Sequence, residues 1–341
     1  MFEKVNRIIS ADEAKAIVPM TAELTAVKAE RDKQLRAIID GSDKRKVIII
    51  GPCSADNEDA VVDYVTRLAK LEEEVKDKLM LMPRIYTEKP RTKGEGYKGM
   101  FHSPNPQTGK TDIQNGICNL RHMHIRAIRE SGLTAADEML YPDNLDYVSD
   151  FLSYIAIGAR STENQQHRLV ASGIDVPVGV KNPMNGSFSV TLNSIYAAQI
   201  PNEFKYGGWQ VRTTGNKYAH AVLRGVVDVY GNNIPNYHYE DVIRFYEQYL
   251  KQHLANPAII IDTNHSNSGK NAFEQIRIAK EIFNNMQYEN FNTVVKGLLV
   301  ESYIEDGNQC VDGGVYGKSV TDPCLGWAKS ERLIRDLAEM L

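Results

Sequence analysis

Short apolar runs alternate along this chain with longer segments whose apolar residues recur at helical spacing. Eight runs have the length and aliphatic content of strands, over residues 46–50, 79–86, 133–136, 155–159, 176–180, 219–223, 258–261 and 294–300. Helical patterns lie between several of them, for example over 60–78, 118–131, 239–253 and 272–285. Eight such units predict an α/β fold, a TIM-type (β/α)8 barrel, with a doubly wound open sheet as the alternative.

Two segments do not fit the repeat. Residues 6–41 are rich in Ala, Glu, Lys and Leu and are interrupted near Pro19, which predicts two helices before the first strand. We therefore expect an N-terminal helical arm over 1–45, which also offers an interface, and the barrel over 46–341. The segment 186–216 combines an alternating run at 187–192, an Ala-containing helix and a second run at 209–212. It predicts an inserted β-containing element between strands 5 and 6, for regulation or assembly.

Composition narrows the class of protein. A hydrophobic content of 42% and a charged content of 25% are typical of a globular protein. The net charge of -4 argues against a nucleic-acid partner, and the apolar runs are too short to cross a membrane. The four cysteines form no C-x-x-C pair, and the first residues show no secretory pattern. We expect a cytoplasmic protein with neither nucleic-acid nor membrane partners.

A cationic loop stands out against the acidic chain. It follows the apolar run 79–82 and carries Arg84, Lys89, Arg91, Lys93 and Lys98. Prolines and glycines keep it out of a helix, and Arg and Lys are suited to phosphate and carboxylate groups. We interpret it as an anion-binding loop, although a charge run is often only solvated surface. The G-x-G-x-x-G match at 94–99 precedes a proline-rich stretch rather than a helix, so it does not predict a dinucleotide site.

A titratable or thiol side chain follows each of the eight runs. In chain order these are Cys53, Arg84, Glu138, Arg160, Lys181, Arg224, His265 and Glu301. In a barrel they would converge on one mouth, where the cations suit a ligand with a phosphate and a carboxylate, or with two phosphates. Cys53, His265 and Glu301, with Asp322 from the final loop, could hold a divalent transition metal. Taken singly, Cys53 and His265 would more often be structural, whereas a buried Glu301 needs a partner.

Several strings in this sequence resemble one family. They are residues 50–54, 84–92, 158–163, 179–182, 262–268, 300–302, 307–309 and 316–322. In this order they are similar to the type I 3-deoxy-D-arabino-heptulosonate 7-phosphate (DAHP) synthases, over about 46–327. The resemblance implies condensation of phosphoenolpyruvate with erythrose 4-phosphate and water to give DAHP and phosphate, the first step of the shikimate pathway.

The resemblance also implies roles for individual residues. Cys53, His265, Glu301 and Asp322 would bind one divalent metal, with Mn²⁺ expected first and Fe, Co or Zn as alternatives. Phosphoenolpyruvate would be held by Arg84, Lys89, Arg160, Lys181 and Arg224, with Glu138 and Ala159 lining its pocket. Erythrose 4-phosphate would meet Lys89, Pro90, Arg91 and Thr92, with Arg91 on its phosphate and Asp322 close by. Lys89 is the candidate proton donor, and Asp262 would orient His265 or the attacking water.

The resemblance leaves the assembly, the effector and the pairing of the cysteines open. Family members are typically dimers or tetramers, so we expect a homodimer or homotetramer. An aromatic amino-acid effector is possible, but residues 139–144 and 205–214 differ from the family's feedback-controlled members. Cys53 and Cys324 flank the expected metal site and could form a disulfide in the metal-free enzyme. The alternative functions are a 3-deoxy-octulosonate 8-phosphate synthase using arabinose 5-phosphate and a non-catalytic regulatory barrel.

Overall fold

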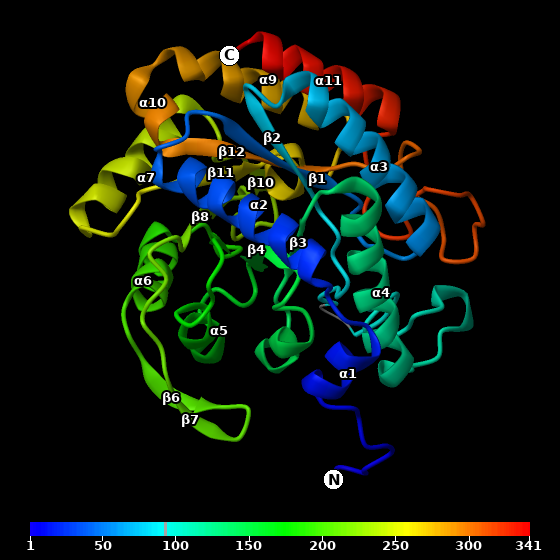
Figure 1. Ribbon diagram of the computed structural model, residues 1–341. Helices are drawn as coiled ribbons and strands as arrows, with labels where there is room; N and C mark the ends of the chain where they lie inside the picture. Colours follow the sequence, from blue (N-terminus) through cyan, green and yellow to red (C-terminus); the bar gives the residue numbers. More distant parts are fainter. Residues whose placement is uncertain (92–93) are drawn as a thin grey trace.

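Eight parallel strands form the centre of the protein in the computed structural model, which describes residues 1–91 and 94–341. Their order in the sheet is β2-β1-β12-β11-β8-β5-β4-β3. They are β1 (Lys46–Gly51), β2 (Leu79–Pro83), β3 (Ala135–Glu138), β4 (Leu152–Ile157), β5 (Val178–Lys181), β8 (His220–Leu223), β11 (Ile259–Asp262) and β12 (Val295–Glu301). Just beyond β2, Arg84 bridges to Ala136 of β3 and closes the sheet into a barrel (Figure 1). The predicted TIM-type fold is confirmed.

Helices cover the outside of this barrel (Figure 1). They are α3 (Glu58–Val75), α4 (Ile113–Ser131), α5 (Gln165–Ala171), α6 (Phe188–Gln199), α7 (Tyr239–Lys251), α9 (Glu274–Asn284), α10 (Glu289–Val294) and α11 (Trp327–Glu339), with short 3-10 turns at 106–108, 142–147 (η2) and 285–287. The four-residue α8 (His265–Ser268) lies instead at the strand-end face, next to the end of β11. Side chains of Asn57, Asp112 and Asn164 accept hydrogen bonds from the first turns of α3, α4 and α5, which explains where these helices begin. None of the helices in the described ranges has both the length and the apolar character needed to span a bilayer.

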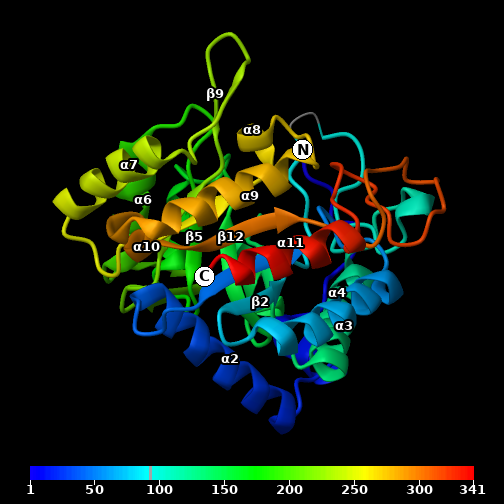
Figure 2. The ribbon, with the colours of Figure 1, turned by 90° about the horizontal axis from the view of Figure 1, so that it is seen from above.

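The N-terminal segment folds as the two expected helices, α1 (Ala11–Ile17) and α2 (Ala22–Asp40). Leu35, Ile38 and Ile39 of α2 are fully buried in one cluster with alternate side chains of the barrel strands, including Val47 and Ile49 of β1. The helix therefore closes the end of the barrel where the strands begin, opposite the strand ends that carry the candidate chemistry (Figure 2).

The segment between β5 and β8 differs in part from its prediction. The run 187–192, which alternates in sequence, is not extended but forms the start of α6, because the Ser187 side chain accepts from the Val190 N–H and caps the helix. The β structure is the antiparallel hairpin of β6 (Glu203–Tyr206) and β7 (Trp209–Arg212), which projects beside the barrel (Figure 1). Thus the inserted element is present, but α6 lies against β5 and β8 as a regular barrel helix.

A second hairpin was not predicted. Strands β9 (Val226–Val227) and β10 (Asn233–Ile234) pair in antiparallel fashion directly after β8, and Asp228 accepts hydrogen bonds from the turn. The strands are too short to give an alternating pattern. Figure 2 shows this hairpin rising from the strand-end face of the barrel next to α8.

Candidate active site

Most of the predicted strand-end residues line one pocket at the carboxyl ends of the strands. The lining comprises Arg84, Lys89, Pro90, Glu138, Leu140, Gly158, Ala159, Arg160, Ser161, Lys181, Met184, Arg224 and His265. The pocket together with its open mouth holds about 480 Å³ of space between atoms. Five cations among these residues face only one carboxylate, Glu138, in the lining. The arrangement favours a small polyanionic ligand.

Arg84 is the most strongly fixed of these cations. Its guanidinium is buried, lies 3.0 Å from the Glu301 carboxylate, donates to the Pro52 carbonyl and stands 3.7 Å from the centre of the Tyr86 ring. Burial by itself would raise the pKa of Glu301, but Arg84 and His265 hold that pKa below its ordinary value. The pair therefore stays ionised inside the barrel.

Lys181 and Arg224 are held differently. The Lys181 ammonium lies 3.5 Å from Glu138 and 3.8 Å from Asp262. Burial opposes ionisation of Glu138, yet Lys181 and Lys89 keep its pKa low. Burial lowers the pKa of Arg224, whose guanidinium has no carboxylate within 4.0 Å in the described part of the chain. Arg224 thus keeps donors available for a ligand.

Beyond Arg84, the cationic loop reaches the pocket through Lys89 and Pro90. The Lys89 ammonium donates to the Cys53 carbonyl at 2.6 Å and lies 3.1 Å from the Cys53 sulfur. Arg91 does not line the pocket; its guanidinium donates to the Tyr97 carbonyl at 2.8 Å. Thr92, expected beside the second substrate, lies outside the described residues, as does Lys93.

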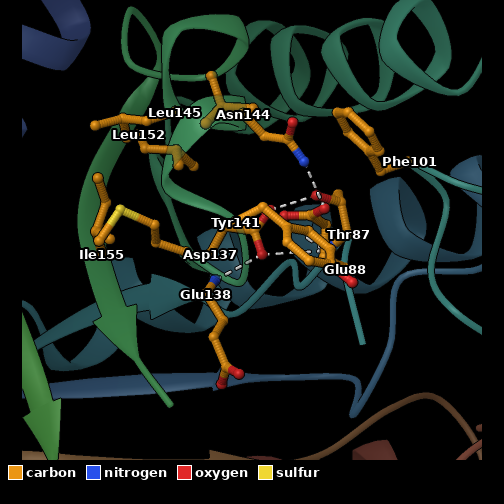
Figure 3. A pocket seen from close by; sticks show the side chains of 12 residues that line it. Thr87, Glu88, Phe101, Asp137, Glu138, Tyr141, Asn144, Leu145, Leu152 and Ile155 are labelled. Carbon is orange, nitrogen blue, oxygen red and sulfur yellow. Dashed lines mark hydrogen bonds between the residues drawn. The ribbon is translucent and has the colours of Figure 1, made fainter. Parts of the chain in front are cut away.

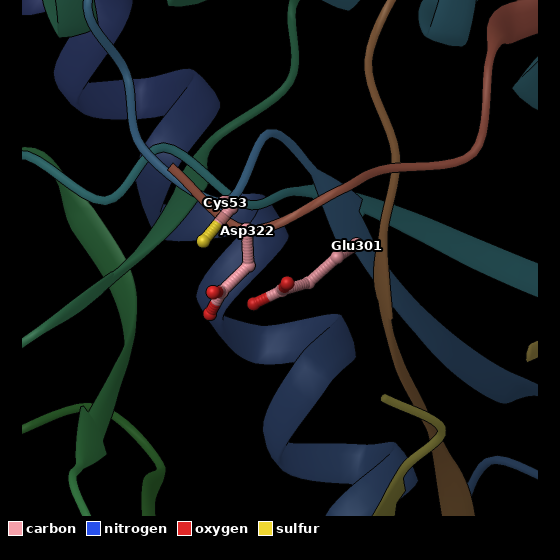
Figure 4. A group of neighbouring side chains, drawn as sticks. All are labelled: Cys53, Glu301 and Asp322. Atoms are coloured by element: carbon pink, nitrogen blue, oxygen red, sulfur yellow. The ribbon is translucent and has the colours of Figure 1, made fainter. Parts of the chain in front are cut away.

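Cys53, Glu301 and Asp322 converge next to the pocket, with ligand atoms within 4.8 Å of one another (Figure 4). Cys53 and Glu301 are buried. One sulfur and two carboxylates at this spacing suit a divalent transition metal. His265, the fourth expected ligand, does not join this group: its Nδ1 atom lies 2.8 Å from Asp262, as the expected orienting contact requires. Asp322 lies 3.0 Å from Lys270.

Comparison with known proteins decides the family. Residues 19–335 match the model of the DAHP synthetase I family. The phospho-2-dehydro-3-deoxyheptonate aldolase of Haemophilus influenzae is 35% identical, covering 99% of this chain and 92% of the relative. The Phe-sensitive enzyme of that name from Escherichia coli K12 is 37% identical, covering 94% and 90%. The structure of the Francisella tularensis SCHU S4 enzyme superposes with a TM-score of 0.93 at 28% identity, covering 100% and 98%.

The chain belongs to the DAHP synthetase I family. This membership confirms the expected enzyme, a DAHP synthase, and the condensation of phosphoenolpyruvate with erythrose 4-phosphate that the resemblance implied. Neither alternative function finds support among these relatives. The family is metal-dependent, and the synthase carries a group of side chains able to hold a metal.

Two residues beside the pocket, Tyr86 and Asn264, were not predicted from the sequence. Tyr86 is buried between two pocket cations, with Lys181 5.6 Å from its ring centre. Asn264 donates to the second Glu301 oxygen at 2.7 Å and fixes that carboxylate. Each lies within two residues of a predicted site residue, but neither has the charge that marked the others.

A small cavity lies behind the synthase pocket and shares Glu138 with it (Figure 3). Glu88, which precedes the proton donor candidate, is buried here and accepts from Asn144 at 2.8 Å. Burial and the nearby Asp137 carboxylate raise the pKa of Glu88 to about 8. Asp137 itself accepts from the Thr87 backbone N–H at 3.0 Å, so both carboxyls anchor the start of the cationic loop.

Proposed function

We propose that the pocket at the strand ends binds phosphoenolpyruvate. The supporting observation is the convergence of Arg84, Lys181 and Arg224, with Arg160 and Lys89 at its edge, on one space next to Glu138 and Ala159. Phosphoenolpyruvate carries a carboxylate and a phosphate, so it needs several cationic donors at once. Among the buried cations of this pocket, Arg224 has no carboxylate within 4.0 Å in the described residues, whereas Arg84 and Lys181 do, so its donors are available to the ligand.

Erythrose 4-phosphate would bind beside it, at Lys89, Pro90 and Arg91, and Thr92, outside the described residues, is a further expected contact. Arg91 would contact the sugar phosphate, and Asp322 would face the sugar. Lys89 would lie between the two substrates. Its side chain lines the phosphoenolpyruvate pocket, and its ammonium lies against Cys53, in the group proposed to bind the metal and, through it, the aldehyde. It is therefore placed to give a proton to the alkoxide that forms when the aldehyde is attacked.

The proposed metal ligands are Cys53, Glu301 and Asp322, which converge, and His265, which stands outside that group with Nδ1 against Asp262 and would offer its other ring nitrogen, Nε2. Mn²⁺ is the first expected ion, with Fe, Co and Zn as alternatives. A bound divalent ion would act as a Lewis acid on the aldehyde carbonyl. Asp262 holds His265, and Asn264 and Arg84 hold Glu301, so two of these side chains are oriented by neighbours. When the enol carbon of phosphoenolpyruvate attacks the aldehyde, Lys89 would give a proton to the new alkoxide. Water then adds to the second carbon of phosphoenolpyruvate and loses a proton, and the resulting hemiketal releases phosphate, which the pocket cations hold, to leave the ketone.

The test is phosphate release from phosphoenolpyruvate by chelator-treated protein, with and without Mn²⁺ and with erythrose 4-phosphate or arabinose 5-phosphate. Release that needs both erythrose 4-phosphate and metal supports the proposal. Metal-independent release would overturn the ligand assignment, and a preference for arabinose 5-phosphate would overturn the choice of sugar. Arg224→Ala should raise KM for phosphoenolpyruvate without changing KM for the aldose.

We further propose control by an aromatic amino acid. The hollow between the β6–β7 hairpin, η2 and α5 is lined by Phe204, Tyr206, Asp146, Asp175 and Lys28, among others. Aromatic rings with both signs of charge suit an amino acid, and one Escherichia coli relative is named Phe-sensitive. Activity measured with added Phe, Tyr or Trp tests this. No effect of any of the three would refute it.

We also propose a cytoplasmic homodimer or homotetramer. The cytoplasmic location is proposed because both substrates are phosphorylated metabolites. The assembly is proposed because the apolar side chains of Met1, Phe2 and Val5, ahead of α1, are exposed. Sedimentation of the full chain and of a chain lacking residues 1–9 tests whether this segment forms the interface. Identical assemblies in both would refute that role.

A further inference from the structure

Arg224 owes its position to its backbone more than to its side chain. Arg84 and Lys181 each lie within 4.0 Å of a carboxylate, whereas among the described residues the Arg224 guanidinium reaches only Ser266 Oγ and Met184 Sδ, both at 3.4 Å. The contact to Ser266 is long for a nitrogen–oxygen hydrogen bond, and the thioether sulfur of Met184 is a weak acceptor. What fixes this cation must therefore be the turn that follows β8.

Asn182 binds that turn from the neighbouring strand. It directly follows Lys181 at the end of β5, and its Oδ1 atom accepts the Arg224 backbone N–H at 2.9 Å. Its Nδ2 group donates to the Gly225 carbonyl at 3.0 Å. One side chain therefore holds two successive residues of the turn and ties the ends of β5 and β8 together.

Two more asparagines complete the network. Asn236 accepts the Gly225 N–H at 2.7 Å and donates to Asn182 Oδ1 at 3.2 Å. Asn267 of α8 accepts the Asn236 N–H at 2.9 Å, and its Nδ2 group donates to the carbonyls of Leu223 at 3.2 Å and Asp262 at 2.8 Å. The bonds thus link the ends of β5, β8 and β11 to the base of the β9–β10 hairpin.

The network is buried and its geometry is tight. Asn182, Asn236 and Asn267 are 0%, 3% and 6% exposed. Gly225 has φ +78°, and a Cβ atom there would lie 2.6 Å from the Asn267 nitrogen, so the turn rests directly on α8. A buried amide that loses its partners costs roughly 1–3 kcal/mol, so each member favours a single arrangement of the others.

We propose that Asn182 and Asn236 are positioning residues for Arg224, which they hold in the same pocket as Lys181 so that both cations can bind phosphoenolpyruvate. The proposal rests on the assignment of Arg224 to phosphoenolpyruvate. A purely structural reading is that the amides only satisfy backbone groups that the sheet leaves unpaired. The two explanations predict different effects of removing an asparagine. A purely structural role would lower stability and leave KM for phosphoenolpyruvate unchanged, whereas a positioning role would also raise that KM.

The experiment compares Asn182→Ala and Asn236→Ala with Asn216→Ala as matched control. Asn216 is also buried and makes similar backbone hydrogen bonds, but it lies at the opposite end of the barrel, beside the start of β8. All three variants should lose thermal stability. Only the first two should raise KM for phosphoenolpyruvate, by about tenfold, because small displacements of a binding group are costly. KM for erythrose 4-phosphate should not change in any of them.

Unchanged KM for phosphoenolpyruvate in both network variants would overturn the proposal, whatever their stability. If Asn182→Ala is not recovered folded, Asn236→Ala decides, because Asn236 lies in a loop rather than at a strand end. The Arg224→Ala variant separates the binding role of Arg224 from the positioning role of the asparagines. If it leaves KM unchanged, the binding assignment is wrong. If it raises KM and the network variants do not, the assignment stands and the positioning role is wrong.

Discussion

Replacing Glu301 with Gln tests the electrostatic centre of the site. The carboxylate is fully buried, lies 3.0 Å from Arg84 and accepts from Asn264 at 2.7 Å. Gln keeps the shape of the side chain but removes the charge. Arg84 then remains charged inside the barrel with no carboxylate beside it, which is the costly way to break a buried pair.

The size of the effect follows from this burial. Removing one partner of a buried ion pair costs roughly 3–5 kcal/mol, and the lower end applies because the Gln oxygen can still accept from Arg84. For a chain of 341 residues, an unfolding entropy of about 2.1 cal/mol/K per residue gives roughly 0.7 kcal/mol/K in total. A loss of about 3 kcal/mol therefore lowers Tm by about 4 °C.

Thermal unfolding with and without Mn²⁺ is the assay. A ligand at a hundredfold excess over Kd stabilises the native state by about 2.7 kcal/mol, so Mn²⁺ should raise the wild-type Tm by about 4 °C. Glu301→Gln should lose this rise. Glu274→Gln is the control, because Glu274 pairs with Arg277 on the surface, where such pairs contribute little. A Glu301→Gln protein with wild-type Tm and an intact Mn²⁺ response would refute the reasoning.

Three further predictions follow from other parts of the structure. The pKa of Glu88 is raised to about 8 in the folded protein, so the fold favours the protonated carboxyl. This contribution to the free energy of unfolding is complete below the pKa of Glu88 in the unfolded chain and is lost as pH rises toward 8. Glu88→Gln should therefore gain Tm over wild type between pH 5 and 8, and a constant difference would contradict this. Gly297→Ala should leave little folded protein in solubility assays, because its Cβ would lie 1.8 Å from the Val47 carbonyl; normal yield and Tm would count against it. Air oxidation of metal-free protein should join Cys53 and Cys324, since the Cys53 N–H donates to the Cys324 sulfur at 3.4 Å, and a thiol count that stays at four would exclude it.

The repeated pattern in the sequence determined the barrel and the positions that carry its chemistry. Each apolar run ends where a strand leaves the core, so the polar residue that follows must stand at the strand-end face. This local rule places Arg84, Lys181 and Arg224 in one pocket. It works because strand length and direction depend on neighbouring residues, and because parallel strands bring all their carboxyl ends to one side.

Local patterns also failed in identifiable places. The run 187–192 alternates like a strand, yet the cap at Ser187 starts a helix that packs on β5 and β8. The strand expected at 155–159 begins at Leu152 instead, because Ser153 and Tyr154 interrupt the apolar run although both are buried. At 187–192 one local signal, the helix cap, outweighed another, the alternation, whereas at 152–154 tertiary burial extended the strand beyond the apolar run.

Only the tertiary structure decided how the site residues pair. Arg84 meets Glu301 across 217 positions of sequence, and Asn182 meets Asn236 across 54. Whether His265 faces Asp262 or the Cys53 group, and that α2 closes the far end of the barrel, likewise depend on the closed sheet. A sequence records which groups a site contains. Their distances arise when the strands close into a barrel, because that step brings remote side chains within hydrogen-bonding range.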